Sequence, residues 1–433
     1  FQYPVTVSGV NISTFLREAL NGVKSDGTPE SRISPMEFKD ILEEQNQVFV
    51  YARGGEKFAI GDPNWDYDYV TWGKAPLTHA FTDINLKDFE KWIKEKQLDL
   101  VLFNEQKIWA PVLLCRELSV LTGAYIDYYT EQTVPMFGLY DFLICNTKKH
   151  HSVFDWHKQC IFLPWGTDTD LYRPENGVNE PERIRFFHSA GMNPFRKGTD
   201  LLLKAFSKIQ GEAKLVIHSQ VSIQSFFPEL EQLILSLKSQ DRLEIHECTV
   251  GAPGLYTRGD VYVYPTRLEG IGLTILEAAS SGLPVIVPDY DPMNEFVDSS
   301  INGKVVKIDK FWSRWDGYYW PQCEVGVFDL TEKMQFYLDN KLSIPQFKAD
   351  AREYALLNFN WKHNTSSLNQ EITKIRQVES KGFSEILIKA KNYDQKLFQR
   401  HKKSTKKLFS EVIEFNYPRA FMVIKKLKSM LRS

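Results

Sequence analysis

Short apolar runs alternate with amphipathic stretches along most of the chain. The apolar, β-branched runs predict strands at Tyr3–Val7, Gln47–Tyr51, Leu98–Phe103, Phe142–Cys145, Ile161–Leu163, Ile184–His188, Lys214–His218, Leu243–His246, Val261–Tyr264 and Pro284–Val287. Apolar positions at helical spacing predict helices at Thr14–Leu20, Asp88–Glu95, Pro111–Thr122, Thr199–Ile209, Glu229–Ser239 and Leu273–Ser281. Because strands that alternate with helices form parallel sheets covered on both faces, the pattern predicts an α/β fold.

The alternation falls into two series. They are separated by Trp165–Asn179, a polar stretch rich in Pro, Gly and Asp that is typical of a linker. We therefore expect a doubly wound domain over 1–174 and a second over 175–360. Ligands bind outside the carboxyl ends of the strands in such sheets, so two facing domains would form a cleft suited to two reactants.

The composition is that of an ordinary globular protein: 433 residues, 43% hydrophobic and 25% charged. The five cysteines include no C-x-x-C pair, which argues against a disulfide framework or a thiolate metal site and favours a reducing compartment. No apolar run approaches the roughly 18 residues of a spanning helix, and no signal peptide is visible. We expect a cytoplasmic protein, with the true N-terminus left open because the chain starts at Phe1.

Positive charge is concentrated at the C-terminal end. Residues 396–433 hold eleven Lys or Arg against two Glu, whereas the whole chain has a net charge of −2. Basic and apolar residues at helical spacing favour an anionic membrane surface, here the inner face, with a solvated extension or a partner protein as the alternatives. Nucleic acid is not expected, because the tail lacks regularly spaced stacking aromatics.

A glycine-containing turn follows the predicted strand Val261–Tyr264. Gly270, Ile271 and Gly272 lead into a helix that starts near Leu273. The glycines let a ligand approach the backbone, and the free N–H groups of Gly272, Leu273 and Thr274 would face it from a helix N-terminus. The turn therefore predicts a phosphate site.

Two acidic residues, Glu269 and Glu277, flank this turn with seven residues between them. A carboxylate beside a pyrophosphate is repelled by it, so we expect these groups to hold neutral sugar or ribose hydroxyls. Placement for the helix dipole is the alternative for one Glu alone. Upstream, Arg196 and Lys197 precede a predicted helix, where two cations could neutralise a departing diphosphate or be a solvated pair.

The stretch VYPTRLEGIGLTILEAASSGLPVIV resembles the E-x7-E region of retaining GT-B glycosyltransferases, specifically glycosyltransferase family 4 (glycosyl transferases group 1). The likeness covers residues 1–376, weakly before residue 95. Further matching segments are Tyr140–Lys148, Ile161–Pro174, Ser189–Phe206, Leu215–His218, Leu255–Pro265, Glu295–Val306 and Phe359–Trp361.

This resemblance implies two Rossmann-like domains facing across a cleft, with the acceptor side in 1–174 and the nucleotide-sugar side in 175–360. It implies a helix over 361–376 that returns to the first domain. Beyond the likeness, the residues themselves predict a basic amphipathic helical tail over 377–433. The implied reaction is front-face transfer of a sugar from a nucleotide sugar to a hydroxyl acceptor, with no metal and no further cofactor. Domain closure and a dry cleft would promote it.

The resemblance also implies roles for single residues. Those of Arg196, Lys197 and Glu269 would be catalytic. The donor would be bound by Gly9, Gly270, Ile271, Gly272, Leu273, Thr274 and Glu277, with Glu277 on the ribose and Glu269 on the transferred sugar. The family usually places its Arg where this chain has Met192, and the paired glycine of the Gly9 loop is Ser8 here. Many relatives carry a His that Tyr125–Tyr129 lacks, so Asp127 is the candidate contact to the sugar or acceptor.

Other motifs receive structural interpretations. The D-x-D at Asp168–Asp170 is expected to be a linker turn rather than a metal site. His150, His151 and His157 are expected on a helix surface. The aromatic segment Phe311–Trp320 looks inserted, and we expect a flap packed on its own domain, with an acceptor platform as the alternative. For the whole chain, the alternatives to a transferase are a non-catalytic partner subunit and, less favoured, a nucleotide-sugar epimerase.

Overall fold

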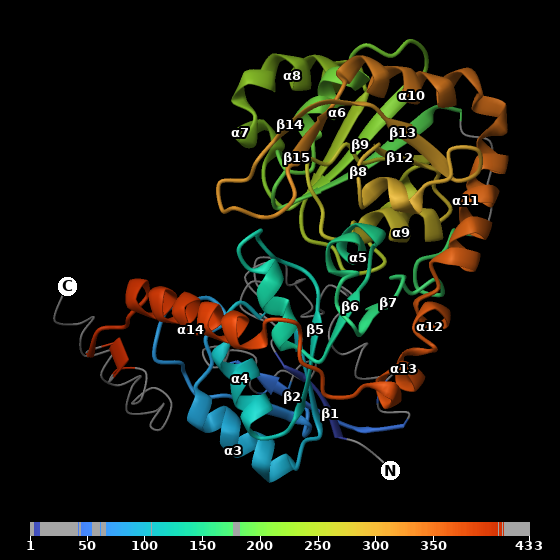
Figure 1. Cartoon of the computed structure of the whole chain (residues 1–433). Coiled ribbons are helices and arrows are strands. Elements are labelled where there is room, and N and C mark those ends of the chain that lie inside the picture. The colour runs from blue at the N-terminus through green and yellow to red at the C-terminus, as the bar shows by residue number, and fades with distance from the viewer. Residues whose placement is uncertain are drawn as a thin grey trace.

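The computed structural model describes residues 4–8, 42, 45–53, 61, 66–104, 106–175, 182–405, 407–408 and 410. The helix expected at Thr14–Leu20 and the glycine loop with Gly9 lie outside these residues. Within them, two α/β domains lie one above the other, joined by the linker after β7 and again by the C-terminal helices, which run back from the second domain to the first (Figure 1).

In the part of the first domain that is described, parallel strands form a sheet in the order β3-β2-β1-β4-β5-β6-β7. The strands are β1 (Pro4–Ser8), β2 (Gln47–Ala52), β3 (Val70–Trp72), β4 (Leu100–Asn104), β5 (Leu121–Tyr125), β6 (Phe142–Cys145) and β7 (Cys160–Phe162). The helices of this domain are α3 (Leu86–Lys96), α4 (Ala110–Glu117) and α5 (Lys148–Phe154), with a 3-10 helix η2 (Val134–Leu139). The expected doubly wound sheet is confirmed.

The second domain contains a parallel sheet in the order β10-β9-β8-β11-β12-β13. Its strands are β8 (Ile184–Gly191), β9 (Ala213–Ser219), β10 (Leu243–Glu247), β11 (Val261–Val263), β12 (Val285–Pro288) and β13 (Gly303–Val306), and a separate antiparallel hairpin follows, β14 (Ile308–Trp312) and β15 (Gln322–Val325). The chain builds outward from β8 to β10 and then returns to the other side of β8 with β11. The point between β8 and β11 is therefore a topological switch point, where such sheets bind ligands.

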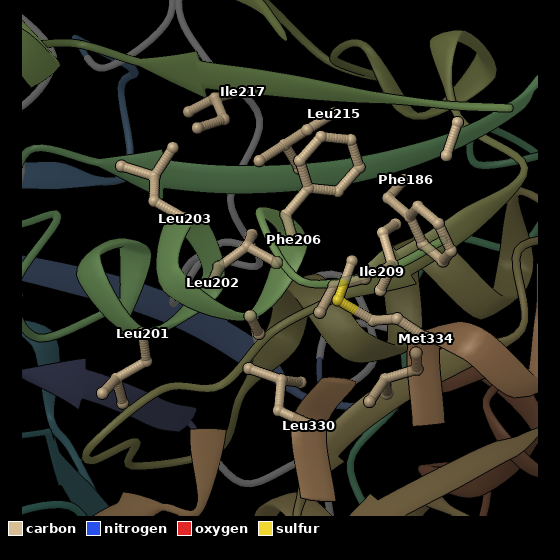
Figure 2. Packing of buried hydrophobic residues seen from close by; sticks show 14 of the residues in the cluster. Phe186, Leu201, Leu202, Leu203, Phe206, Ile209, Leu215, Ile217, Leu330 and Met334 are labelled. Carbon is tan, nitrogen blue, oxygen red and sulfur yellow. The ribbon is translucent and has the colours of Figure 1, made fainter. Parts of the chain in front are cut away.

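Helices cover both faces of this sheet. They are α6 (Thr199–Phe206), α7 (Ile223–Phe226), α8 (Glu231–Ser239), α9 (Leu273–Ser280), α10 (Val327–Asp339) and α11 (Ile344–Asn358), with 3-10 turns η3 (Pro228–Leu230), η4 (Tyr256–Arg258), η5 (Met293–Phe296) and η6 (Lys341–Ser343). Figure 2 shows how Leu202, Leu203 and Phe206 of α6 pack between the sheet residues Phe186 and Leu215 and the residues of α10. This core fixes the end of α6 that faces the switch point.

One predicted boundary is wrong. The helix expected over Pro111–Thr122 ends at Glu117, and β5 begins at Leu121. Ser119 has a φ of 60°, which a helix cannot accommodate, so the chain reverses there and enters the sheet. Because β5 is also buried, the apolar residues continue past the turn. Helical periodicity alone therefore does not reveal where the helix ends.

The chain returns to the first domain after α11. The short helices α12 (Trp361–Asn364) and α13 (Leu368–Lys374) follow, and Leu368 and Ile372 pack in a cluster with residues of the first sheet. The helix α14 (Phe383–Arg400) then crosses the first domain (Figure 1). Its Asp394 carboxylate accepts the Ala110 N–H at 2.7 Å, which caps the N-terminus of α4.

Part of the helical tail expected from residue 377 therefore packs on the first domain of the same chain. After α14, Lys403 donates from Nζ to the Pro76 carbonyl at 2.8 Å, and His79 donates its N–H to the His401 carbonyl at 2.7 Å. The docking is possible because α14 has an apolar face as well as its basic one. The expectation of a membrane or protein partner for residues 396–433 stays a prediction, and 411–433 lie outside the described residues.

Candidate functional site

A pocket of about 320 Å³ opens at the carboxyl ends of β8 and β11, at the switch point of the second sheet. It gathers the predicted site residues Asp127, Arg196, Lys197, Glu269, Gly270, Ile271, Gly272, Leu273, Thr274 and Glu277. Asp127 enters from the first domain, whereas the others come from the loops after β8 and β11 and from α9. Gly9, the remaining predicted residue, lies outside the described residues.

The turn at Gly270–Gly272 forms one wall of the pocket. Gly272 is the N-cap of α9 with φ 88° and ψ 43°, a left-handed conformation that favours glycine. No side chain caps this helix, so the first N–H groups of α9 lie at the pocket. A helix N-terminus with uncapped N–H groups and its positive dipole end is suited to binding a phosphate group.

Glu269 stands at the centre of a hydrogen-bonded cluster in the floor of the pocket. Its Oε1 accepts from Lys197 Nζ at 2.7 Å, from the Tyr264 hydroxyl at 2.9 Å and from Thr266 Oγ1 at 2.7 Å. Lys197 Nζ also contacts the Tyr264 hydroxyl. The carboxylate is therefore held in one orientation by a charged and two neutral donors.

The protonation state of Glu269 follows from these neighbours. Burial by itself would raise the pKa of the carboxyl, but the charges of Lys197 and Arg196 and the hydrogen bonds from Lys197 and Thr266 outweigh burial and lower the pKa to about 2. Glu269 is thus ionised at neutral pH and acts as a hydrogen-bond acceptor. This chemistry suits a hydroxyl donor such as a sugar.

The two basic residues differ in their surroundings. Lys197 is largely buried and bonded to Glu269, whereas the Arg196 side chain is 42% exposed and its Nη1 lies 3.8 Å from Glu269 Oε2. Lys197 therefore has a structural role in addition to its charge. The guanidinium of Arg196 is at the pocket surface, where an incoming anion can reach it.

Glu277 lies on α9 and lines the same pocket as Glu269, with a different hydrogen-bond partner. Its Oε2 accepts from the buried Tyr256 hydroxyl at 2.5 Å. Glu277 is 8% exposed and lines the pocket. The second acid is therefore also held by a tyrosine.

Two loops are tied together to form this site. The Arg267 guanidinium donates to Asp200 at 2.7 and 2.8 Å and to the Phe195 carbonyl at 2.5 Å. The Arg267 N–H donates to the Arg196 carbonyl at 2.7 Å. The loop after β11 thereby holds the loop that carries Arg196, so the basic pair and Glu269 are positioned as one unit.

The approach of these loops depends on Gly198, and replacing it is our first prediction. Gly198 has φ 72°, and a Cβ there would lie 2.0 Å from the Pro265 carbonyl oxygen. We expect Gly198→Ala to lower the free energy of unfolding by about 2 kcal/mol or more and to weaken anion binding, because the loops must separate. Urea unfolding measures the first effect and nucleotide titration the second.

Gly191→Ala is the matched control for this substitution. Gly191 also has a positive φ of 56°, but a Cβ there meets nothing within 4 Å. The control therefore carries the left-handed strain without the clash. Equal losses in the two variants would contradict the role assigned to the close approach at Gly198.

Sequence reasoning missed the residues that hold the predicted acids. Tyr264 and Thr266 bond Glu269, and Tyr256 bonds Glu277. Tyr256 and Tyr264 lie within Leu255–Pro265, a segment that resembles the family. The resemblance indicated this segment but not the role of the two tyrosines. Thr266 and Arg267 lie in the stretch that resembles the family, but the sequence did not indicate the role of Arg267 because its partner Asp200 is distant in sequence.

Two expectations about polar motifs have definite outcomes. His150 and His157 are buried rather than on a helix surface, with His150 Nδ1 at 2.9 Å from the Tyr129 hydroxyl and His157 Nε2 at 3.1 Å from the Tyr140 carbonyl. Asp168 Oδ1 accepts the N–H groups of Asp170 and Leu171, both at 3.0 Å, so this motif is a capped turn.

The described residues contain no group of three or more His, Cys, Asp or Glu side chains arranged to hold a metal ion. Among the helices of the described part of the chain, none is long and apolar enough to span a membrane.

Two doubly wound domains with a pocket at the switch point of the second give the chain a GT-B fold, which confirms the expected fold. A sequence model described as Glycosyl transferases group 1 matches residues 183–312, from the start of the second domain into β14. The likeness to this family is thus found in part of the second domain.

The chain is also similar in sequence to individual curated proteins. An uncharacterised glycosyltransferase of Methanocaldococcus jannaschii is 29% identical over 151 residues, which are 32% of this chain and 37% of that protein. A GDP-mannose-dependent alpha-(1-6)-phosphatidylinositol monomannoside mannosyltransferase of Mycobacterium tuberculosis is 29% identical over 174 residues, 34% of this chain and 42% of that protein. The chain spans less than half the length of these two curated relatives.

Among solved structures, the chain is similar to Anabaena Alr3699/HepE in complex with UDP. The TM-score is 0.63, and the match covers 86% of this chain and 100% of that chain. The sequence identity is 13%, so this likeness establishes the fold.

Proposed function

We propose that the protein is a retaining glycosyltransferase that moves a sugar from a nucleotide-sugar donor to a hydroxyl acceptor without a metal. The proposal rests on one observation. The N–H groups at the start of α9, a basic pair and two carboxylates line the same pocket. A nucleotide sugar has the matching groups: a diphosphate for the N–H groups and cations, and hydroxyls for the carboxylates.

The donor diphosphate would lie against the N-terminus of α9, with the Arg196 guanidinium on its other side. As the bond to the sugar breaks, negative charge grows on the leaving diphosphate, and fixed N–H dipoles and a cation stabilise that charge. Lys197 contributes its charge from the floor while it holds Glu269. In a front-face reaction the leaving phosphate also accepts the acceptor proton, so no side-chain base is needed.

The two carboxylates would bind the hydroxyl groups of the donor. Ionised Glu269 accepts from the transferred sugar, and Glu277 from the ribose, each held by a tyrosine. Asp127 approaches from the first domain, from which the acceptor would enter. A cleft closed over both substrates excludes water and keeps the reacting groups in contact.

The identity of the donor base is not fixed by this proposal. One relative is named for GDP-mannose and one structural neighbour holds UDP. We therefore test UDP and GDP separately by thermal shift, followed by incubation with a panel of UDP- and GDP-sugars. Release of the nucleoside diphosphate supports the transferase, an epimerised sugar indicates an isomerase, and absence of both binding and turnover indicates a non-catalytic partner subunit.

Replacing Glu277 is the second prediction. We expect Glu277→Ala to weaken donor binding by roughly 10- to 100-fold with a smaller change in kcat, because a hydroxyl contact away from the breaking bond stabilises bound substrate and transition state alike. Isothermal titration with the nucleotide and steady-state kinetics measure the two quantities.

Tyr256→Phe is the companion variant, since it removes the donor that orients Glu277 and leaves the carboxylate in place. Its effect on binding should be smaller than that of Glu277→Ala. A large fall in kcat with an unchanged donor affinity in Glu277→Ala would rule out the ribose role.

A further inference from the structure

The aromatic segment that looked inserted joins the two domains. The Tyr319 N–H donates to the Tyr129 carbonyl at 3.0 Å, and the Tyr128 hydroxyl donates to the Asp316 carbonyl at 3.0 Å. The Tyr128 and Tyr318 rings stack with centroids 5.3 Å apart. The segment starts at the end of β14 and runs towards β15, and the family match ends at residue 312. It contacts the first domain as well as its own, where the Tyr290 and Phe311 rings have centroids 5.1 Å apart. The expectation of a flap packed on its own domain alone is therefore wrong, whereas the acceptor platform stays a prediction.

A second contact between the domains fixes α5. The Glu295 carboxylate, from the second domain, accepts the N–H groups of Lys148 at 2.6 Å and Lys149 at 2.8 Å at the start of α5. Lys149 Nζ donates to the Asp291 carbonyl at 2.6 Å and lies 4.9 Å from the centre of the Trp320 ring. The first turn of α5, which carries His150, is thus held by the second domain.

Three side chains connect the inserted segment to that turn. Trp320 Nε1 donates to the Tyr129 hydroxyl oxygen at 2.6 Å, and the same hydroxyl lies 2.9 Å from His150 Nδ1. Tyr129 is fully buried and His150 is 1% exposed. The chain of contacts therefore runs from the second domain, through the first, to a buried imidazole.

The hydrogen-bond directions in this chain follow from the donors available. An indole N–H can only donate, so the Tyr129 oxygen is the acceptor for Trp320. The buried Tyr129 O–H must then donate to His150 Nδ1, because the alternative leaves two N–H groups pointing at one oxygen and its own proton unpaired. His150 is consequently neutral with its proton on Nε2.

The imidazole is joined to the segment that carries the pocket residue Asp127, because its partner Tyr129 lies two positions after Asp127 in the chain. Burial lowers the pKa of His150 to about 4, while the Asp127 carboxylate and the Gly270 main chain act in the opposite direction. His150 Nε2 is buried and makes no hydrogen bond among the described residues. A Cβ on Gly270 would lie 3.4 Å from Asp127 Oδ1, so these two pocket residues also face each other.

We propose that Trp320, Tyr129 and His150 form a relay of positioning residues by which the inserted segment presents a fixed Nε2–H to the Gly270–Asp127 side of the pocket. The relay sets the distance between the Gly270–Gly272 turn and the first domain when the two domains are in contact. Its role in turnover rests on the proposed function, whereas its hydrogen-bond order does not.

The first test is independent of activity. Nitrogen NMR of the full chain labelled with ¹⁵N-histidine reports which ring nitrogen carries the proton. We expect His150 to be in the Nε2–H form at neutral pH and expect Trp320→Phe, which removes the indole N–H, to give a mixture of the two tautomers. Assignment uses His150→Gln. A wild-type signal for Nδ1–H, or no change in Trp320→Phe, overturns the relay.

The control for this test is Trp315→Phe, in the same segment, where the side chain is 94% exposed. It should leave the His150 signal unchanged. A shift as large as that of Trp320→Phe would show that the signal follows disturbance of the segment in general, and would also overturn the proposal.

The second test separates positioning from packing. We expect Tyr129→Phe, which keeps the ring, to lower kcat by about 10- to 100-fold with a donor KM within about twofold, because a misplaced reacting group costs rate more than binding. Tyr337→Phe removes a buried hydroxyl from the core of the second domain and should change neither. Equal kinetics in both variants refute the role in turnover. A wild-type chain that neither binds nor cleaves any donor refutes the proposed function instead, and the NMR result then decides the relay alone.

Discussion

Arg196→Ala is expected to lower the rate of sugar transfer or donor hydrolysis by roughly 10²- to 10³-fold. The guanidinium is at the pocket surface, 3.8 Å from Glu269, and in our proposal it stabilises charge that appears only as the diphosphate departs. The effect should therefore fall on kcat rather than on the donor KM. Single-turnover kinetics with a saturating nucleotide sugar measure it directly.

The stability of this variant should stay close to that of the wild type, because Arg196 is half exposed and Lys197 still pairs with Glu269. Arg258→Ala is the matched control: its side chain is 54% exposed and it pairs with Glu244, away from the pocket. A variant lacking Arg196 that turned over as fast as the Arg258 control would contradict the leaving-group role.

Lys197→Met is expected to lower the free energy of unfolding at pH 7 by about 3 kcal/mol, because it leaves the buried Glu269 carboxylate without its closest cation. In the wild type this pairing keeps the pKa of Glu269 near 2, below the ordinary value of 4.5. A depressed pKa stabilises the fold above pH 4.5, and that contribution is lost as the pH falls from 4.5 towards 2. The difference between variant and wild type should therefore shrink over this interval.

Urea titrations at several pH values measure this dependence. Lys204→Met, on the exposed side of α6, is the control and should leave the free energy of unfolding nearly unchanged at every pH. A loss in Lys197→Met that is constant from pH 7 to pH 3 would indicate a packing defect and contradict the electrostatic account.

The sequence pattern predicted the architecture because each strand of a covered parallel sheet is a short apolar run with a helix on either side. It failed at β3, where Val70–Trp72 is short and half-buried, and at the end of α4, where buried helix and buried strand share one apolar run. Local patterns locate a buried strand well when polar residues bound it, and poorly when it is short and half-buried or when a buried helix and a buried strand follow each other.

The pocket residues were found because they occur in one continuous stretch around Gly270 and beside one basic pair. Their supports were not, because hydrogen bonds such as those of Arg267 with Asp200 and Trp320 with Tyr129 join positions far apart in the chain. The aromatic segment shows the limit most clearly. Its composition indicated an unusual surface, but its partner is a tyrosine pair almost two hundred positions earlier.

The return of α13 and α14 to the first domain makes that domain discontinuous along the polypeptide. Leu368 and Ile372 complete its apolar cluster, and Asp394 caps α4. During synthesis the second domain can therefore close on itself before the first has all its parts, since the ribosome must pass residue 400 before α14 can dock. A shortened chain that stops at the linker would leave the first domain with an open apolar face, so the two halves are better separated by cutting between them after folding than by expressing them apart.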